Sequence, residues 1–564
     1  MLRQRFLVSV LLATAGCGRG PFPNTWELAP GSPTDATSGM VSSSHQLASD
    51  VGAGVLARGG NAVDAAVAVG FALAVVHPEA GNIGGGGYMV IRLGGVVTTL
   101  DYRETAPEGA RRDMFLDSLG AVTEAGVTGH LAAGVPGSVA GMVEAHRRYG
   151  ALPLPDVLAP AVALARDGFE IDGYRARSLA RAATRLAQFE GSRAQFLPNG
   201  AAPPEGSRFT QPDLARTLQA IADSGDRVFY EGYIADLIAQ EMARGHGIMT
   251  KPDLAAYRPV WREPIQFQYR GYTIYSMAPS SSGGVTLAII LNVLEGYDAL
   301  PPQGSPQQIH LMAESMRRAY TDRNEYLGDP AFVDMPVERL ISDEYALARG
   351  SDIDLDRATS PADVPSGISE GDHTTHYSVV DAAGNAVAVT TTINSGYGSA
   401  VTVTGAGFLL NNEMDDFTSA PGQPNIYGLV QGEANAIESG KRMLSSMTPT
   451  LVLDPAGELM LVLGSPGGAT IISTLAQVIS NVVDHGMRLP QAIRAPRVHH
   501  QGQPDTLFYE PGGLRGAAVA MLEAMGHATS ERSDYSGEVN AIEVRAGHHV
   551  GVADPRRGGG ASGH

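Results

Sequence analysis

The chain has 564 residues, of which 43% are hydrophobic, 69 are glycine and 35 are proline. This composition supports a large core and is typical of a loop-rich enzyme rather than a helical bundle. The formal net charge of −19 at pH 7 argues against nucleic acid as a partner, because its phosphates would be repelled. No linker is visible inside the body, so we expect one large α/β unit.

The N-terminus carries the only cysteine, Cys17, so the sequence excludes an internal disulfide. Arg3 and Arg5 precede an apolar stretch at 6–15, and small residues follow up to Cys17. This pattern predicts a secretory signal that is too short to span a membrane. The Ala-Gly-Cys ending resembles a bacterial lipoprotein signal, in which the cysteine becomes the lipidated first residue. An ordinary signal peptide with an incidental cysteine is the alternative.

The N-terminal pattern also predicts where the protein resides. We expect a signal peptide over 1–17 and a flexible tether over 18–37, which is rich in Gly, Pro and Ser. The protein would then be exported by a bacterium, as a periplasmic or outer-membrane-anchored lipoprotein with a lipid on Cys17.

Hydrophobic periodicity and capping residues predict the elements of the body. A helix follows His45 and ends at glycines 59–60, and Asn61 caps a buried helix over 62–76. The further elements expected before residue 300 are strands 88–92, 96–102 and 269–276 and helices 138–146, 156–165, 214–221, 233–243 and 283–294.

The C-terminal third is rich in strands. Strands 375–380 and 386–393 flank a turn at 382–385, and strands 449–453 and 459–463 flank a turn at 454–457. A helix over 469–483 follows. Strands with helices packed on them predict a helix/sheet/sheet/helix sandwich.

Thr374 lies where a polar loop, 351–372, enters the first of these hairpins. If the backbone is cut before Thr374, this residue carries both a hydroxyl nucleophile and a free α-amine, as an N-terminal-nucleophile hydrolase requires. Such an amine has a pKa of about 7.7–8.0, so a large neutral fraction can accept the hydroxyl proton near neutral pH. Taken alone, Thr374 is more simply the start of a strand.

Several stretches in one order carry a resemblance that changes this interpretation. They are 60–66, 81–86, 101–104, 135–137, 279–284, 374–394, 409–417, 444–449 and 464–468. With them the chain resembles the γ-glutamyltransferase (γ-glutamyltranspeptidase) family of self-cleaving N-terminal-nucleophile enzymes. The resemblance implies an α/β (α+β) fold, a four-layer αββα sandwich. It also implies cleavage between His373 and Thr374, which gives a heterodimer of a large subunit, 38–373, and a small subunit, 374–564, that share one core.

The resemblance implies roles for four catalytic residues. Thr374 is the nucleophile, and Thr392 places a second hydroxyl against it. Gly467 and Gly468, between a strand and a helix, would direct two backbone N–H groups at the oxyanion.

The resemblance also implies how the substrate is held. Arg103, Ser445 and Ser446 would bind the α-carboxylate, since a guanidinium suits bidentate recognition. The resemblance assigns Asn394, Glu413 and Asp416 to the α-ammonium. It also implies a lid loop over 424–441 that covers the bound γ-glutamyl group, with Tyr427 as its gate. Some members carry Gln where this chain has Glu413. The presence of the lid favours small donors that are similar to glutathione.

The implied activity is hydrolysis or transfer of γ-glutamyl groups from glutathione and other γ-glutamyl compounds, with no cofactor. Two alternatives remain open, an acylase for glutaryl amides or cephalosporin side chains, and a catalytically silent lipoprotein scaffold. The pairs His499-His500 and His548-His549 lack the i, i+4 spacing of a helical zinc site, so we expect no metal. The glycine run 84–87 lacks the Lys-Ser/Thr ending of a phosphate loop and is better explained as a close backbone crossing.

The cleavage hypothesis leads to a direct test. Purified protein should give two fragments, the smaller one beginning at Thr374, when intact mass and N-terminal sequence are measured. The Thr374→Ala variant should remain one inactive chain near 58.9 kDa, because alanine has no hydroxyl to attack the preceding carbonyl. Fragments that begin at another residue would contradict the assignment.

Overall fold

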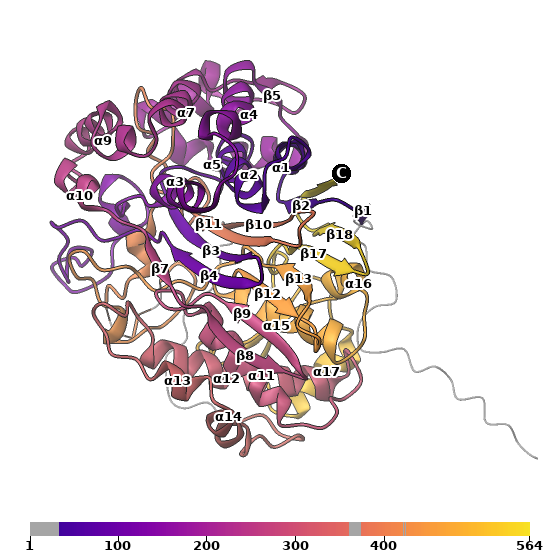
Figure 1. The fold of residues 1–564 in the computed structure, drawn as a ribbon. Helices are drawn as coiled ribbons and strands as arrows, with labels where there is room; N and C mark the ends of the chain where they lie inside the picture. Colours follow the sequence, from indigo (N-terminus) through magenta and orange to yellow (C-terminus); the bar gives the residue numbers. More distant parts are fainter. Residues whose placement is uncertain (1–32, 360–373, 421, 424) are drawn as a thin grey trace, which may run out of the picture.

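The computed structural model describes residues 33–359, 374–420, 422–423 and 425–564. The predicted signal peptide 1–17 with Cys17, most of the predicted tether and His373 lie outside the described residues. Figure 1 shows the arrangement, with two sheets at the centre and helices on both outer sides. The predicted αββα sandwich is thereby confirmed.

The first sheet contains the hairpin that begins at Thr374. Within the described residues it has seven strands, all paired antiparallel, and β10 and β11 lie near its centre. Every residue of β10 and β11 is buried because both faces of the sheet are covered. In spatial order the strands are β19 (Gly560–Gly563), β2 (Met40–Ser43), β10 (Thr374–Val380), β11 (Ala386–Thr392), β3 (Gly86–Leu93), β4 (Val96–Asp101) and β7 (Val260–Arg262).

The second sheet also has seven strands in the described part of the chain. Its order is β1 (Thr34–Ala36), β18 (His548–Ala553), β17 (Asn540–Arg545), β13 (Leu459–Leu463), β12 (Thr450–Leu453), β9 (Tyr272–Ser276) and β8 (Ile265–Tyr269). Apolar side chains of both sheets, such as Val90 and Val380 from the first and Leu451 and Val462 from the second, form one buried cluster between them. The segments before and after Thr374 therefore contribute to the same core.

Helices cover the first sheet on its outer face, at the top of Figure 1. The innermost is α2 (Ala62–Val76), whose 15 residues are all buried, and Asn61 and Asp64 close its N-terminus in a capping box. The other helices of this layer are α1 (Gln46–Ala57), α3 (Ser138–Tyr149), α4 (Leu154–Asp167), α5 (Gly173–Leu186), α6 (Glu190–Phe196), α7 (Pro212–Ser224), α8 (Arg227–Tyr230), α9 (Tyr233–Arg244) and α10 (Lys251–Ala256).

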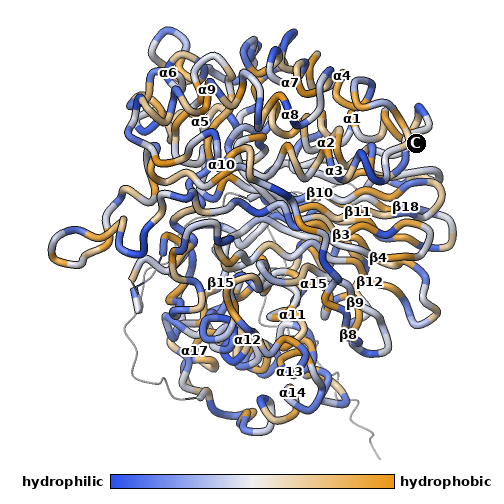
Figure 2. Tube along the Cα trace, turned by 60° about the vertical axis from the view of Figure 1, so that its left-hand side comes forward, coloured by the Kyte–Doolittle hydropathy of each residue, from blue (hydrophilic) through white to orange (hydrophobic). Residues whose placement is uncertain are grey.

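A second helical layer packs on the other sheet and buries the apolar faces of α11, α12 and α15. Figure 2 shows hydrophobic residues concentrated along the sheets and the helix faces that meet them. The layer comprises α11 (Gly283–Glu295), α12 (Pro306–Tyr326), α13 (Val337–Leu340), α14 (Asp343–Gly350), α15 (Thr470–Val483), α16 (Leu489–Arg494) and α17 (Gly516–Ala524). Short strands pair at the periphery, β5 (Phe169–Glu170) with β6 (Arg208–Phe209), and β15 (Leu507–Tyr509) with both β14 (Val498–His499) and β16 (Thr529–Glu531).

Two sequence predictions need correction. The strand expected over 269–276 is a hairpin, because the backbone reverses at Arg270 and Gly271, which have φ of 52° and 80°. The tether expected over 18–37 does not extend to residue 37, because Thr34–Ala36 forms strand β1 and pairs with β18. Backbone hydrogen bonds with a distant strand override the local composition in this segment.

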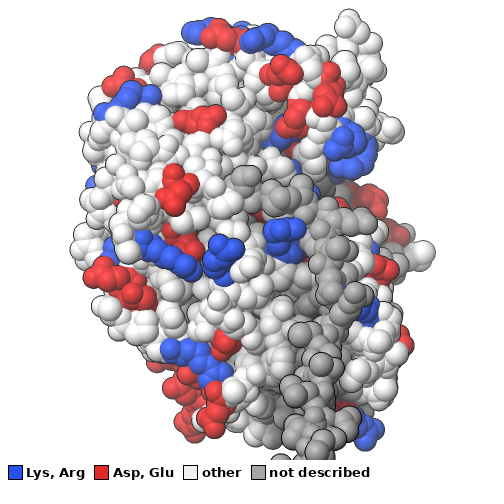
Figure 3. Space-filling model, turned by 90° about the vertical axis from the view of Figure 1, so that its right-hand side faces the viewer, with Lys and Arg blue, Asp and Glu red and all other residues white. Residues whose placement is uncertain are grey.

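The surface carries both signs of charge. Figure 3 shows acidic and basic side chains interspersed among uncharged ones on one face of the molecule. In the part of the chain that the structure describes, none of the helices combines the length and apolarity needed to cross a membrane.

The glycine run 84–87 is a close backbone crossing beside β11, as the sequence indicates. A Cβ atom added at Gly85 would lie 2.0 Å from the carbonyl oxygen of Thr392, and one at Gly84 would lie 2.1 Å from that of Leu409. Asn82 reinforces the crossing, since its Nδ2 donates to the Thr392 carbonyl and its Oδ1 accepts from the Gly85 N–H. The run therefore fixes the end of β11.

We predict that Gly85→Ala disturbs the end of β11. The added methyl group must displace backbone, which should cost roughly 3 kcal/mol of stability and reduce self-cleavage. Gly516→Ala is the matched control, because its Cβ would meet nothing within 4 Å. Thermal unfolding and the cleaved fraction on a gel measure both effects. Wild-type melting and cleavage in Gly85→Ala would refute this account of the crossing.

Candidate active site

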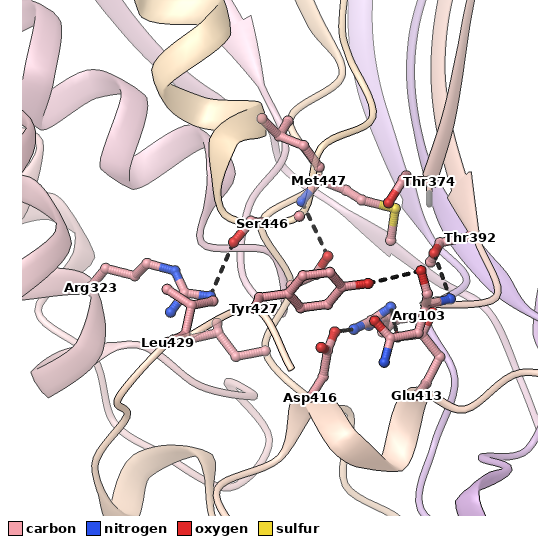
Figure 4. Close-up of a pocket in the computed structure, with 15 residues that line it drawn as sticks. Arg103, Arg323, Thr374, Thr392, Glu413, Asp416, Tyr427, Leu429, Ser446 and Met447 are labelled. Atoms are coloured by element: carbon pink, nitrogen blue, oxygen red, sulfur yellow. Dashed lines mark hydrogen bonds and ion pairs between the residues drawn. The ribbon is translucent and has the colours of Figure 1, made fainter. Parts of the chain in front are cut away.

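One pocket gathers most of the residues that the sequence singles out. Its lining residues are Arg103, Arg323, Thr374, Thr392, Asn394, Glu413, Asp416, Tyr427, Leu429, Leu444, Ser445, Ser446, Met447, Gly468 and Ile471. Figure 4 shows these side chains converging on one space. Of the predicted catalytic and binding residues that the structure describes, only Gly467 is absent from the lining, and it adjoins Gly468.

Thr374 and Thr392 face each other across the central hairpin. Thr374 is the first residue of β10 and pairs in register with Thr392, the last residue of β11. Directly opposite residues of an antiparallel pair point to the same face, with Cβ atoms about 4.5–5.5 Å apart. The N–H of Asn394 donates to Thr392 Oγ1 at 2.7 Å, so the Thr392 hydroxyl proton is free to point toward Thr374.

His376, the nearest histidine in sequence among the described residues, is not available as a base. His376 is buried, which lowers its pKa to about 3. Both of its ring nitrogens are engaged, Nδ1 at 2.8 Å from Thr390 Oγ1 and Nε2 at 3.1 Å from Ser378 Oγ. Among the described residues that line the pocket there is no histidine. A proton acceptor for Thr374 therefore has to come from another group.

Gly467 and Gly468 form the sharp turn between β13 and α15. Their φ angles are 137° and 52°, a conformation that a side chain would disfavour. Their carbonyls accept from the first turn of α15, that of Gly467 from the Thr470 N–H at 2.9 Å and that of Gly468 from the Ile471 N–H at 3.3 Å. The Gly468 N–H shares a trans peptide with the Gly467 carbonyl, so it points away from the helix. It can therefore serve as one donor of an oxyanion hole, the role that the resemblance implies for both glycines.

Arg103 lies at the centre of an acidic cluster formed by Glu104, Glu413 and Asp416. Its Nη1 is 2.7 Å from Glu413 Oε2 and 3.5 Å from Glu104 Oε2, and its Nη2 forms an ion pair with Asp416. The side chain of Arg103 is 1% exposed. The resemblance assigns Arg103 to the substrate α-carboxylate, and Glu413 and Asp416 to the α-ammonium. In the structure Arg103 contacts both of these acids.

Burial governs the electrostatics of this cluster. Burial opposes the charge of Arg103, but the facing Glu413 and Asp416 raise its pKa, so it stays cationic. Burial also raises the pKa of Glu413 and of Asp416, and Arg103 only partly offsets this effect. Arg103 thus faces three buried carboxyl groups whose ionisation burial opposes, and a second cation beside them would favour their charged forms.

The serine pair lies across the pocket from Arg103. The Ser445 N–H donates to the Ser280 carbonyl at 3.0 Å, and the Ser445 carbonyl accepts from Ser282, so a neighbouring loop holds the segment. Ser446 Oγ accepts from Arg323 Nη2 at 3.1 Å, an interaction drawn in Figure 4. The serine segment thus has a defined position opposite the acidic cluster.

Arg323, on helix α12, lines the pocket and is missed by the sequence reasoning. A signal is present, because Met312, Met316, Tyr320 and Arg323 follow the spacing of one helix face, and the first three are buried. A charged residue that continues an apolar stripe has to be buried with a partner or at a site. The apolar lining residues Leu429, Leu444, Met447 and Ile471 carry no comparable signal.

Tyr427 closes one side of the pocket. Its hydroxyl donates to the Asn394 carbonyl at 2.8 Å, and the residue is 6% exposed. Gln501 Nε2 holds the same segment through the Gly428 carbonyl at 2.8 Å. Asn394, with φ of 72°, thus connects Tyr427 to Thr392. Residue 424, at the start of the predicted lid, lies outside the described residues.

The histidine pairs noted in the sequence lie outside the pocket lining and have contacts of their own. Burial lowers the pKa of His549, the second histidine of the pair 548–549. The hydrogen bonds of the other three join His499 to Ser473 and Gln501, His500 to Asp505, and His548 to Asp35.

The described residues do contain one group with metal-binding geometry, formed by His310, Glu314 and His527. The two rings bond directly to each other, with His310 Nδ1 2.7 Å from His527 Nε2. The Glu314 oxygens already bond to Arg317, Arg318 and Thr359. Both ring nitrogens of His310 and the Glu314 oxygens are thus engaged within the protein, whereas His527 Nδ1 has no hydrogen-bond partner among the described residues.

Comparison with known proteins places this site in a family. The sequence profile of the gamma-glutamyltranspeptidase family matches residues 48–564. The glutathione hydrolase proenzyme of Escherichia coli strain K12 is 46% identical over 540 residues, which cover 93% of this chain and 91% of that protein. The acylase ACY 1 proenzyme of Pseudomonas sp. strain SE83 is 39% identical, and the match covers 90% of each chain.

A solved structure agrees with the sequence comparisons. Cephalosporin acylase from Bacillus halodurans has a TM-score of 0.86 and 27% identity, and the match covers 96% of this chain and 99% of that one. The chain is therefore an enzyme of the N-terminal-nucleophile class. It belongs to the γ-glutamyltranspeptidase family, and the resemblance seen in the sequence is confirmed.

The acidic cluster predicts a pH dependence of stability. Burial raises the pKa of Glu104 from 4.5 to about 8, so between these values the folded chain binds a proton that the unfolded chain has lost. Stability should therefore fall as pH rises through this window. Glu104→Gln should remove the part of this loss of unfolding free energy that Glu104 causes. That part is on the order of 5 kcal/mol at pH 9, since one pKa unit corresponds to about 1.4 kcal/mol.

This effect can be measured by denaturant unfolding from pH 5 to pH 9. Both Glu104→Gln and the control Glu458→Gln, a change in an exposed turn, are made in the uncut Thr374→Ala background, so that all chains unfold as one. Equal pH slopes for Glu104→Gln and its parent would show that Glu104 is ionised throughout.

Proposed function

We propose that the protein is a self-processed γ-glutamyltransferase and glutathione hydrolase, which cleaves γ-glutamyl amides through a γ-glutamyl ester on Thr374. The observation that carries this proposal is the single pocket in which Thr374 and Thr392 lie together with Arg103, Glu413 and Asp416. A nucleophile beside charged groups of both signs suits a donor that carries both an ammonium and a carboxylate.

In the proposed maturation, the Thr374 hydroxyl attacks the carbonyl carbon of His373. The peptide C–N bond breaks, its nitrogen takes a proton, and the acyl group is left as an ester on Thr374 Oγ1. Water then opens the ester. Maturation gives a large subunit that ends at His373 and a small subunit, 374–564, with a free α-amine on Thr374.

In the proposed turnover, this amine removes the proton from the Thr374 hydroxyl as the oxygen attacks the γ-carbonyl carbon. The oxyanion accepts hydrogen bonds from Gly467 and Gly468, and one such donor typically contributes on the order of 3–4 kcal/mol. Thr392 holds the attacking oxygen. The amine of the leaving group takes the proton, and water or an acceptor amino acid then releases the γ-glutamyl group.

The acidic cluster favours a donor with an ammonium. Glu413 and Asp416 share one cation, Arg103. The ammonium of a bound donor would place a second positive charge beside them. Asn394 and Tyr427 would bound the same space. The α-carboxylate would bind on the other side of the pocket, where the serine pair 445–446 lies.

An acylase for glutaryl or cephalosporin amides is the second candidate. It is favoured by the similarity to an acylase proenzyme at 39% identity and to a cephalosporin acylase structure. A glutaryl group has no ammonium, however, so it would form no ion pair with Glu413 or Asp416. Burial would then keep favouring the protonated forms of these carboxyl groups, and the acidic side of the pocket would add nothing to binding.

We further propose that residues 1–17 are a lipoprotein signal, that Cys17 carries a lipid, and that the protein is exported to the periplasm or the outer membrane. Residues 18–33 would be the tether. The arrangement of Arg3, Arg5, the apolar stretch and Cys17 supports this proposal.

The substrate proposal is tested with matched anilides. The enzyme should hydrolyse γ-glutamyl-p-nitroanilide at least about 10²-fold more efficiently than glutaryl-p-nitroanilide, because a site built for a charged group rejects an analogue that lacks it. The variant Asp416→Asn should lower the ratio of the efficiency for the γ-glutamyl anilide to that for the glutaryl anilide. A faster glutaryl reaction in the wild-type enzyme would decide for the acylase.

A further inference from the structure

Arg323 is a buried cation that neutral groups surround. It is 1% exposed, and its Nε donates to Ser282 Oγ at 2.9 Å. Its Nη1 donates to Asn324 Oδ1 at 2.9 Å and to Gln431 Oε1 at 3.2 Å, and its Nη2 donates to Ser446 Oγ at 3.1 Å. Among the described residues, no carboxylate lies within ion-pair distance of Arg323. Its charge therefore lacks a counterion inside the described protein.

The two arginines of the pocket differ in this respect. Arg103 pairs with Glu413 and Asp416, whereas burial lowers the pKa of Arg323 to about 10. Asp416 is the one described carboxylate whose charge reaches Arg323, and it is already paired with Arg103. Burying a charged arginine without an anion beside it costs free energy. Because both arginines line the same pocket, an anionic group bound there can pair with Arg323.

The hydrogen bonds of Arg323 leave a donor for such an anion. A guanidinium has five N–H groups, and the contacts above leave one N–H on Nη2 without an acceptor among the described residues. The same contact makes Ser446 Oγ an acceptor, and no described group accepts from the Ser446 hydroxyl. Arg323 and Ser446 thus present two adjacent donors, as a carboxylate requires.

We propose that Arg323 is a substrate-binding residue, which binds the α-carboxylate of the γ-glutamyl group together with Ser446. Arg323 supplies a positive charge that Arg103, shared among buried carboxylates, supplies only in part. The ammonium and carboxylate of the donor are then recognised by separate charges on opposite sides of the pocket. This inference rests on the proposed function and adds Arg323 to the residues that select a donor with an α-carboxylate.

The test compares two donors that differ only in that carboxylate. These are γ-glutamyl-p-nitroanilide and 4-aminobutanoyl-p-nitroanilide, which keeps the amine and the scissile amide. Arg323→Met should lower kcat/KM for the first donor on the order of 10- to 100-fold, mainly through KM, as expected for the loss of a charged hydrogen bond. For the second donor the change should be under about threefold, because it makes no such bond.

The matched control is Arg318→Met on the same helix. Arg318 is 5% exposed but pairs with Glu314 and Asp352 and does not line the pocket. Arg318→Met should leave the ratio of the two donors unchanged, whatever it does to stability. Cleavage into two chains on a gel confirms that each variant is folded.

Arg323→Lys keeps the inference testable if the methionine variant fails to fold. Its ammonium should preserve part of the preference for the carboxylate donor at low pH. The preference should fall as pH rises, because a buried lysine loses its proton, whereas wild type should keep a constant ratio. A constant ratio in Arg323→Lys equal to that of wild type would count against the proposal.

Two outcomes separate this inference from the proposed function. If wild type prefers the glutaryl anilide, the proposed function fails whatever Arg323 does. If wild type prefers the γ-glutamyl donor but Arg323→Met lowers both amine-bearing donors equally, Arg323 is only structural and this inference alone is overturned.

Discussion

The register of the β10–β11 hairpin is the constraint on which the site depends. It places Thr374 directly opposite Thr392, and the glycine run that leads into β3 holds the end of β11 through contacts that leave no space for a side chain. A shift by one residue would turn a whole strand's side chains to the other face of the sheet. Because the strands are buried on both faces, such a shift is strongly disfavoured, and the two hydroxyls stay together.

The second physical feature of the site is the separation of its charges. Arg103 is surrounded by Glu104, Glu413 and Asp416, whereas Arg323 is surrounded by neutral acceptors. Both arginines are buried, so neither is screened by salt as a surface charge would be. The pocket thus has an acidic side that can take a cation and a basic side that can take an anion. A zwitterionic end group fits this distribution.

Much of the fold follows from local patterns. The sequence predicts helix α2 with its observed ends, because Asn61 caps it and nearly every residue in it is small or apolar. It does not predict β8, β17, β18, β19 or the long helix α12, and it begins the strand that corresponds to β9 too early, at Tyr269, the last residue of β8. Strands such as β19, with the sequence Gly-Ala-Ser-Gly, have weak β-propensity and exist because a distant strand supplies hydrogen-bond partners.

The candidate site, like the fold, is predicted from the sequence only in part. The resemblance to a known family names the groups that could do chemistry: a threonine at the start of a hairpin, a glycine pair before a helix, and an arginine and acids in matching motifs. It cannot say which charges neutralise one another. That Arg103 meets Glu413 and Asp416, and that Arg323 reaches the pocket from helix α12, follows only from the folded chain. The effective strength of a charge depends on burial and on the partners that folding brings within a few ångströms, and neither is encoded by neighbours in the sequence.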